Sequence, residues 1–207
     1  MRVVIAGGHG KIALRLARML AARGDEAVGV VRNPDHVDDV AATGARAVVL
    51  DLEHASVDQV AEVLTGADAV VFAAGAGPGS GAARKDTVDH AAAVLVADAA
   101  EHAGVRRHVQ ISAMGLDRAG DPGMDEVFGA YLRAKAAAED DLRARANLDW
   151  TILRPGRLTD DPATGQVQLA ESVPRGSVSR EWVAATVLLL LDRSDHIGRT
   201  LEIVSAD

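Results

Sequence analysis

Three glycines near the start of the chain limit its fold more than any other feature of the sequence. Gly7, Gly8 and Gly10 stand between RVVIA (2–6), a run typical of a buried strand, and a helical pattern that starts at residue 10. Glycine loses more backbone entropy on folding than any other residue, so its use here indicates that side chains must be absent. The stretch GGHGKIA fits the pattern G-x-x-G-x-x-A at a strand-to-helix junction.

This pattern at such a junction is typical of a site for the pyrophosphate of a dinucleotide. The first glycine makes the tight turn, the second lets the backbone approach the pyrophosphate, and Ala13 lets the helix pack closely on the strand. Free amides and the positive helix end hold the anion, so we expect the whole turn to contact the cofactor: Gly7, Gly8, His9, Gly10, Lys11 and Ile12. The alternatives are an ordinary glycine turn and, for His9, a residue that merely tolerates a strained φ.

Short runs rich in β-branched residues alternate with longer helical patterns along the chain. The runs are almost continuously apolar, as expected for parallel strands covered on both faces. Strands are expected over residues 2–6, 27–31, 46–50, 68–74, 107–112 and 150–154, and helices over about 10–23, 35–43, 56–65, 84–103 and 125–146. This alternation predicts an α/β fold, a doubly wound parallel sheet with helices on both faces.

After Pro155 the alternation gives way to a loop-rich sequence. We expect one short strand near 166–170, a helix over 179–192 and a last strand over 199–204. These elements are too few for a second hydrophobic core, so they predict a lobe that rests on the sheet.

A chain of 207 residues is long enough for one well-buried domain and short for two. We therefore predict a single domain over 1–207. It would consist of a dinucleotide-binding core over 1–154 and a small C-terminal substrate lobe over 155–207.

The residues that follow the second and third strands bear on which dinucleotide binds. NAD-binding proteins usually carry an acid at the end of the second strand, but Arg32 stands here and the first acid is Asp35. A guanidinium suits a 2′-phosphate, which predicts NADP(H) in preference to NAD(H); a solvated surface arginine is the alternative. After the third strand, Asp51 and Leu52 are expected to meet the adenine, although Asp51 could equally be a turn residue.

The fourth strand ends in small residues, Ala73, Ala74 and Gly75. Small side chains there would let the cofactor cross the carboxyl edge of the sheet, where such folds bind ligands. The glycines of the next stretch, 77–81, are explained equally well by a flexible loop.

Three residues further along the chain are candidates for chemistry. Ser112 lies at the carboxyl end of the fifth strand, and YLRAK (131–135) puts Tyr131 and Lys135 on one helix face. A nearby ammonium favours ionisation of a phenol, so Tyr131 would exchange a proton while Lys135 also binds the nicotinamide ribose. Ser112 would orient a substrate carbonyl beside the cofactor. The alternative is a half-buried tyrosine beside a surface lysine.

Composition excludes several other classes of function. The net charge of −8 and only five aromatic residues argue against nucleic-acid binding, and the absence of cysteine excludes disulfides and thiolate catalysis. The seven histidines form no ligand pair, so no metal site is predicted. The longest apolar stretch, VAATVLLLL, is too short to span a bilayer, so a cytoplasmic protein with no membrane partner is expected.

In combination, the motifs GGHGKIA, VVRNP, VFAAG, ISAMG, YLRAK and TILRPGRLTDDPATG resemble the atypical short-chain dehydrogenase/reductase family. Within it, the chain is similar to the small single-domain NAD(P)H-binding, epimerase/dehydratase-like group, and the resemblance spans essentially the whole chain. It implies a Rossmann fold with Ser112, Tyr131 and Lys135 near the nicotinamide and the TILRPG loop at the border of that pocket. It also implies a dinucleotide that lies over Gly7, Gly10, Arg32, Asp51, Ala74 and Gly75.

The leading hypothesis is an NADP(H)-dependent oxidoreductase that transfers a hydride to a small carbonyl, quinone or flavin-like acceptor. Arg32 would select the phosphate, and Tyr131, Lys135 and Ser112 would manage the proton. Two alternatives remain: a non-catalytic NADP(H)-binding sensor of redox state, and a sugar epimerase or dehydratase. The expected partner is a small-molecule substrate, and the chain would be a monomer or a homodimer.

Overall fold

The computed structural model describes residues 1–77 and 79–206 of the chain. Its main sheet is made of strands from the whole length of the sequence. They are β1 (Arg2–Ala6), β2 (Glu26–Val31), β3 (Arg46–Val49), β4 (Ala69–Phe72), β5 (Arg107–Ile111), β6 (Asp149–Pro155), β8 (Val167–Ala170) and β10 (Arg199–Ser205).

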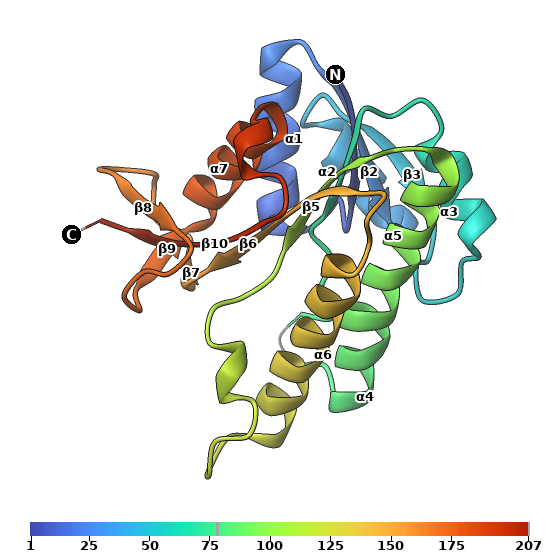
Figure 1. Cartoon of the computed structure of the whole chain (residues 1–207). Helices are drawn as coiled ribbons and strands as arrows, with labels where there is room; N and C mark the ends of the chain where they lie inside the picture. The colour runs from blue at the N-terminus through green and yellow to red at the C-terminus, as the bar shows by residue number, and fades with distance from the viewer. Residues whose placement is uncertain (78, 207) are drawn as a thin grey trace.

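The sheet has eight strands in the order β3-β2-β1-β4-β5-β6-β10-β8 (Figure 1). The pairings from β3 to β10 are parallel, and β8 pairs with β10 in the antiparallel direction. The order runs outward in both directions from β1 and β4, so the path of the chain reverses between these two strands. The predicted doubly wound, Rossmann-like α/β fold is confirmed.

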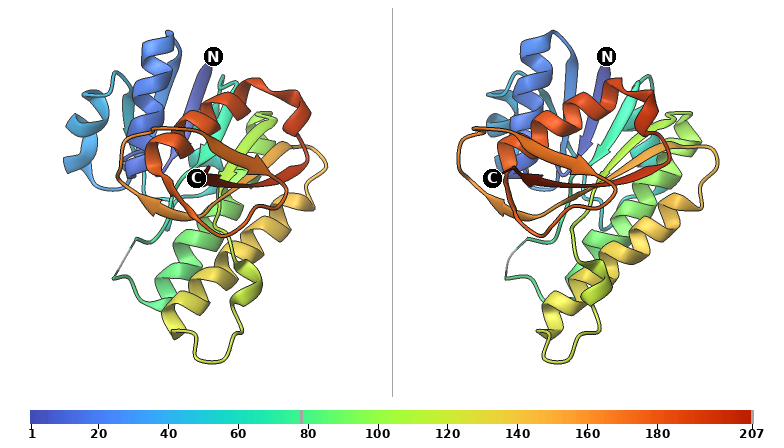
Figure 2. Two further views of the ribbon diagram at one scale, coloured as in Figure 1. Left: turned by 90° about the vertical axis from the view of Figure 1, so that its left-hand side faces the viewer. Right: turned by 60° about the vertical axis from the view of Figure 1, so that its left-hand side comes forward.

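Helices cover both faces of this sheet (Figures 1 and 2). On one face, α1 (Lys11–Arg23) packs against α7 (Arg180–Asp192), and the short α2 (Val37–Ala41) lies beside α1. The other face carries α3 (Val57–Leu64), α5 (Ala92–Ala103) and α6 (Glu126–Arg143).

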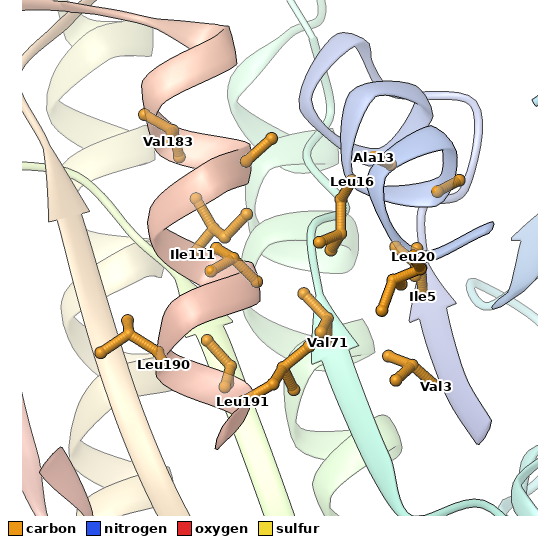
Figure 3. Packing of buried hydrophobic residues seen from close by; sticks show 14 of the residues in the cluster. Val3, Ile5, Ala13, Leu16, Leu20, Val71, Ile111, Val183, Leu190 and Leu191 are labelled. Atoms are coloured by element: carbon orange, nitrogen blue, oxygen red, sulfur yellow. The ribbon is translucent and has the colours of Figure 1, made fainter. Parts of the chain in front are cut away.

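Because successive side chains of a strand alternate between faces, each strand feeds two cores. Val3 and Ile5 of β1 pack under α1 with Leu16 and Leu20, as Figure 3 shows. Val4 and Ala6 of the same strand belong to the cluster under α3 and α5. This is why the strands read as continuous apolar runs in the sequence.

Residues 155–207 do more than rest on the sheet. The strand β10 pairs with β6 and so extends the main sheet, and β8 forms its edge. Two further strands, β7 (Arg157–Thr159) and β9 (Ser177–Ser179), pair in parallel as a small second sheet that the sequence did not predict. A strand of three residues is too short to show a hydrophobic period, which explains the omission.

The helix expected over 84–103 is also more complex than predicted. It begins as α4 (Ala82–Lys85), continues through a π-helical turn, η2 (Asp86–Ala91), and then becomes α5. The described residues also include three short 3₁₀ turns: η1 (Pro34–His36), η3 (Leu116–Arg118) and η4 (Ser194–His196). A π turn is rare and is frequently found at functional sites, so the one at Asp86–Ala91 is of interest for the site described below.

His108 of β5 is fully buried, and neither of its ring nitrogens has a hydrogen-bond partner among the described residues. Its neighbour Val109 packs in the cluster under α7, so His108 points to the opposite face, toward α5 and α6. Burial, and then the charges of Arg145 and Arg107, lower the pKa of His108 from 6.5 to about 3. The imidazole is therefore neutral in the folded protein.

We expect the wild-type protein to lose stability below pH 6.5 relative to a His108→Leu variant. The unfolded chain takes up a proton at His108 near pH 6.5, whereas the folded chain resists protonation down to about pH 3, so acid favours unfolding across this window. At about pH 4.5 the effect amounts to about 2–3 kcal/mol. Urea unfolding of both proteins at neutral and acid pH measures it; a stability difference that does not change with pH would contradict the prediction.

Among residues 1–77 and 79–206, no helix is long and apolar enough to cross a membrane.

Candidate functional site

A pocket lies at the carboxyl edge of the sheet, where the strand order reverses between β1 and β4. It has a volume of about 310 Å³. Its walls come from the loops after β1, β2, β3 and β4 and from the start of the helical segment 82–103. Among the lining residues are Gly7, His9, Gly10, Arg32, Asn33, His36, Asp51, Leu52, Glu53, Ala73, Ala74, Gly75 and Arg84.

The glycines of the first turn are required partly by the packing of the protein itself. Gly7 has a φ of +84°, and a Cβ there would stand 2.6 Å from the Cα atom of Ala74. A Cβ on Gly8 would stand 2.6 Å from the Cα atom of Gly29 in β2. Architecture alone therefore accounts for Gly7 and Gly8. Gly10 is less crowded by the protein than Gly7 and Gly8. A Cβ on Gly10 would stand 3.2 Å from its nearest neighbour, the carbonyl oxygen of Gly7.

The helix α1 opens toward this pocket with no side-chain cap at Gly10 and no acid in its first turn. Its first amides therefore lack a partner of this kind among the described residues, which suits an anion at the helix N-terminus. Only the backbone amide of Lys11 is available to such an anion, because its side chain points to Asp160, with 2.6 Å between Nζ and Oδ2. Ile12 packs against the core.

His9 is not at a strained φ, because no described residue other than glycine has a positive φ. That part of the sequence interpretation is wrong. The His9 ring instead stacks on His36, with 3.5 Å between ring centroids and 9° between planes, and its Nε2 lies 2.8 Å from Oδ2 of Asp39. The stack closes one wall of the pocket, next to Arg32.

The ends of β2 and β3 bring Arg32, Asp51 and Leu52 to the same pocket. Asp51 accepts a hydrogen bond from the Glu53 amide and contacts the His54 ring, so it stabilises its own turn while it lines the pocket. Burial alone would raise the pKa of Asp51, but these two hydrogen bonds outweigh it and hold the pKa below its usual value. Leu52 packs against the core under α3 and α5.

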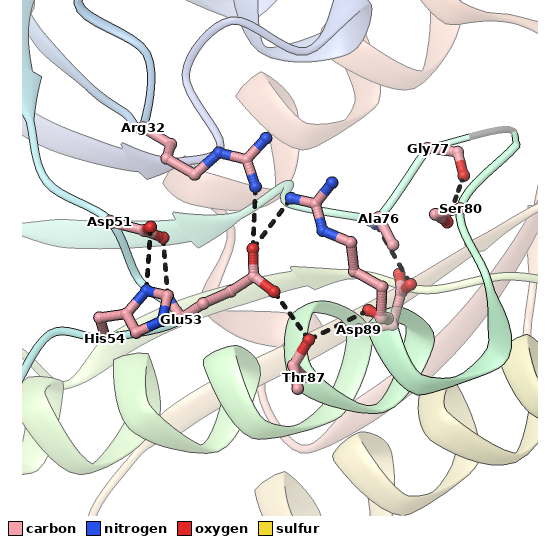
Figure 4. Close-up of polar contacts among 10 residues, drawn as sticks. Arg32, Asp51, Glu53, His54, Ala76, Gly77, Ser80, Thr87 and Asp89 are labelled. Carbon is pink, nitrogen blue, oxygen red and sulfur yellow. Dashed lines mark hydrogen bonds and ion pairs between the residues drawn. The ribbon is translucent and has the colours of Figure 1, made fainter.

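Glu53, which sequence reasoning missed, holds two arginines at this end of the pocket. Arg32 Nη1 and Arg84 Nη2 each lie 2.9 Å from its Oε2 atom, and the Thr87 hydroxyl donates to Oε1 at 2.8 Å. Figure 4 shows Glu53 between Arg32 and Thr87. The side chain of Arg32 is 51% exposed, so the guanidinium is tethered but remains accessible.

The loop after β4 runs past a buried carboxylate. Ala73 continues the hydrogen bonding of the sheet to Ala6, and the chain then crosses the sheet edge at Ala74 and Gly75. A Cβ on Gly75 would stand 3.1 Å from Oδ1 of Asp89, and the Ala76 amide donates to Oδ2 of Asp89 at 3.2 Å. The absence of a side chain at Gly75 thus gives room to Asp89.

Asp89 and Lys135 form a buried ion pair that does not itself line the pocket but lies next to Gly75 and Ala76, which do. Lys135 Nζ lies 3.3 Å from Oδ1 of Asp89 and also contacts the carbonyl oxygens of Ile111 and Ala74, at 3.3 Å and 3.5 Å. Asp89 is fully buried and Lys135 is 4% exposed. Burial lowers the pKa of Lys135, and Asp89 opposes this effect.

Sequence reasoning also missed Asp89, although a signal was present. Asp89 precedes the buried Ala93 by one helical turn and the buried Val96 by two, so its position faces the core. A carboxylate at a core position is rarely left unpaired, which predicts a cationic partner on a neighbouring element.

Tyr131 lies on α6 one turn before Lys135, as the spacing predicts. Nζ of Lys85 is 5.3 Å and Nζ of Lys135 is 6.0 Å from the centroid of its ring, and Phe128 stacks against it. Burial first, and then the charge of Asp89, raise the pKa of Tyr131 above its usual value. The sequence interpretation expected the lysine to favour the ionised phenol. In the structure burial and the charge of Asp89 shift the pKa in the opposite direction, so Tyr131 keeps its proton.

Ser112 follows β5 directly and is buried. Its amide donates to the carbonyl oxygen of Leu153, but its Oγ has no hydrogen-bond partner among the described residues. Because Lys135 contacts the carbonyl of the preceding residue, Ile111, the serine and the lysine are adjacent. The structure therefore places Lys135 beside both Tyr131 and Ser112, with Asp89 as its ion-pair partner. None of these four residues is among those that line the pocket. Within the described parts of the chain, no three potential metal-ligating side chains form a group.

Comparisons with known proteins agree with this geometry. Residues 7–194 match a protein-family model described as NAD(P)H-binding. The “Uncharacterized sugar epimerase YhfK” of Bacillus subtilis is 33% identical over 208 residues, which cover 100% of this chain and 95% of that protein.

Two solved structures are similar over the whole chain. A protein from Bacillus halodurans, described as “Putative NAD-dependent epimerase/dehydratase”, is 34% identical with a TM-score of 0.90 and is covered over 95% of its length. ChuY of Escherichia coli O157:H7, described as an anaerobilin reductase, is 26% identical with a TM-score of 0.81 and is covered over 98% of its length. Each alignment covers 100% of this chain.

Proposed function

The chain belongs to the NAD(P)H-binding family, in the atypical short-chain dehydrogenase/reductase group, and from this we propose that it is an NADP(H)-dependent oxidoreductase. Its acceptor would be a small carbonyl, quinone or flavin-like molecule. The observation that carries the proposal is the buried ion pair of Lys135 and Asp89, which contacts the pocket-lining residues Ala74 and Ala76. Tyr131 and Ser112 lie beside that lysine. Open α/β sheets bind their ligands at this edge, where the strand order reverses.

The pocket suits a dinucleotide. The uncapped start of α1 and the amides that follow Gly10 would hold the pyrophosphate. Arg32 would contact the 2′-phosphate, and Asp51 with Leu52 would border the adenine, since all three line the pocket. Ala74 and Gly75 would border the nicotinamide half. A bound nicotinamide supplies a hydride, and the protein supplies orientation and the proton.

We assign the proton to Tyr131. As the acceptor carbon receives the hydride, its oxygen gains negative charge, and the phenol of Tyr131 would donate its proton to that oxygen. The free Oγ of Ser112 would donate a hydrogen bond to the same oxygen before and during transfer. The Lys135 ammonium, held by Asp89, would stabilise the resulting phenolate until solvent restores the proton.

The pKa of Tyr131 favours reduction over the alternative chemistry. Two of the relatives have an epimerase in their names. Oxidation of a hydroxyl, with which such a reaction starts, needs a base that removes the hydroxyl proton. Burial and Asp89 raise the pKa of Tyr131, so at neutral pH the residue is a neutral phenol, the form that has a proton to donate.

We propose that the acceptor binds between Ser112 and the segment 155–179. The carboxyl end of β6 adjoins the loop after Ser112, because the Met114 amide donates to the carbonyl oxygen of Pro155 at 3.1 Å. The chain leaves the main sheet at this point and forms β7 and β9, so these residues would shape the acceptor side of the pocket.

Arg32→Ala tests the choice of cofactor. We expect NADPH to bind about 10- to 100-fold more weakly, because charge-assisted hydrogen bonds to a phosphate are lost, and NADH binding to stay within about twofold. Calorimetric titration of each nucleotide measures this. Arg46→Ala is a matched control, since it removes an equal charge from an exposed position outside the pocket. Equal losses for both nucleotides would argue against a phosphate contact at Arg32.

A further inference from the structure

The carboxylate of Glu53 has the position that an external anion would take between two arginines. Arg32 comes from the end of β2 and Arg84 from α4, yet one nitrogen of each guanidinium lies 2.9 Å from the same oxygen, Oε2. The other oxygen accepts the Thr87 hydroxyl. The side chain of Glu53 is 17% exposed, so it is mostly withdrawn from solvent.

Two guanidinium groups that converge on one point repel each other unless an anion lies between them. Glu53 supplies that anion in the structure. Arg32 has five N–H donors, and its contact with Glu53 uses one nitrogen. Its other donors have no partner among the described residues and could bind a second acceptor; a phosphate oxygen has the geometry that guanidinium groups bind.

The same carboxylate also has the chemistry to bind a sugar hydroxyl. Glu53 lines the pocket with Arg32 and Asp51, at the end where the adenosine half would lie. A carboxylate there accepts a hydrogen bond from a ribose 2′-hydroxyl, which is how acids in NAD sites act. The sequence lacks an acid at the end of β2, but the fold supplies one from the loop after β3.

We propose that Glu53 and Arg84 set the choice between the two dinucleotides, an inference that rests on the proposed function. With NADP(H), the 2′-phosphate replaces Glu53 as the anion between Arg32 and Arg84. With NAD(H), Glu53 keeps both arginines and accepts the 2′-hydroxyl. Arg84 is then a second phosphate ligand, and Glu53 is an internal competitor of the phosphate that allows NAD(H) to bind as well.

The Glu53→Gln variant tests whether Glu53 competes with the phosphate or instead helps the arginines to bind it. The amide keeps the shape of Glu53 but cannot neutralise two guanidinium groups, so the arginines become available to the phosphate. We expect NADPH to bind about 5- to 10-fold more tightly and NADH about 3- to 10-fold more weakly. Glu62→Gln is the matched control, because this glutamate is exposed on α3 and lies outside the pocket.

Arg84→Gln gives the second arm of the experiment. We expect NADPH binding to weaken about tenfold, while NADH binding stays within about twofold. Arg118→Gln, at an exposed arginine of η3, controls for the loss of charge. Calorimetric titration of all variants with NADPH and NADH, together with thermal melts, completes the set.

The outcomes are distinct. Weaker NADPH binding in Glu53→Gln would overturn the proposal, because Glu53 would then support the phosphate site and not compete with it. Changes that are equal for both nucleotides would also overturn it. If the wild-type protein binds neither nucleotide, the proposed function itself fails; if it binds NADPH and the variants behave like their controls, this inference alone fails.

Discussion

Replacement of Tyr131 with Phe is expected to lower kcat by about 10²- to 10⁴-fold, the usual contribution of a positioned proton donor. The variant keeps the ring that packs near Phe128 and the two lysines but loses the phenolic proton. Binding of NADPH should not change. The rate is measured as loss of reduced nicotinamide absorbance with an acceptor from a panel of quinones, dicarbonyls and flavins that the wild type reduces.

Phe128→Leu is a suitable control for this variant. Phe128 stacks against Tyr131 and is 48% exposed, so its replacement alters the packing around the phenol without removing a proton donor. We expect its kcat to stay within about tenfold of the wild type. Full activity of Tyr131→Phe would show that hydride transfer in this protein takes its proton from another group.

Gly7→Ala should cause a large loss of stability, because it combines conformational strain with a steric clash. The alanine would adopt a φ of +84° with its Cβ 2.6 Å from a backbone atom of Ala74. The left-handed conformation costs about 1–2 kcal/mol, and the forced shift of the loop after β4 adds about 1–3 kcal/mol. The variant should also fail to bind NADPH, because Ala74 lines the pocket.

Gly24→Ala separates these two costs. Gly24 has the same φ of +84° at the end of α1, but a Cβ there would meet nothing within 4 Å. We expect this variant to lose only the conformational cost, about 1–2 kcal/mol, and to bind the nucleotide normally. Urea unfolding of both variants measures the difference, and equal losses would disprove the steric part of the argument.

The fold could be predicted from the sequence because its signals are local. Each strand from β1 to β6 is a short apolar run, and the glycines at both ends of α1 mark its boundaries. The pairing of β10 with β6 has no such local signal. It depends on contacts between residues far apart in the sequence, so no local pattern indicates that 199–204 joins the main sheet.

The same distinction applies to the candidate site. The glycine turn and the spacing of Tyr131 and Lys135 are visible over a few residues. Glu53 contacts Arg32 and Arg84 across 21 and 31 residues, and no local pattern predicts such a contact. The direction of the Tyr131 pKa shift was missed for this reason, since it depends first on burial and then on Asp89, and both result from the packing of α6 against a different helical segment.

The π-helical turn at Asp86–Ala91 makes the length of this segment part of the site. Arg84 and Thr87 contact Glu53, which lines the pocket, while Asp89 contacts Lys135 and the Ala76 amide. Successive residues of an α-helix are rotated by about 100° around its axis, so deletion of one residue here would turn one set of contacts away from its partners. A change in residue count would thus separate the contacts of Glu53 from the Asp89–Lys135 pair even if every functional side chain were retained.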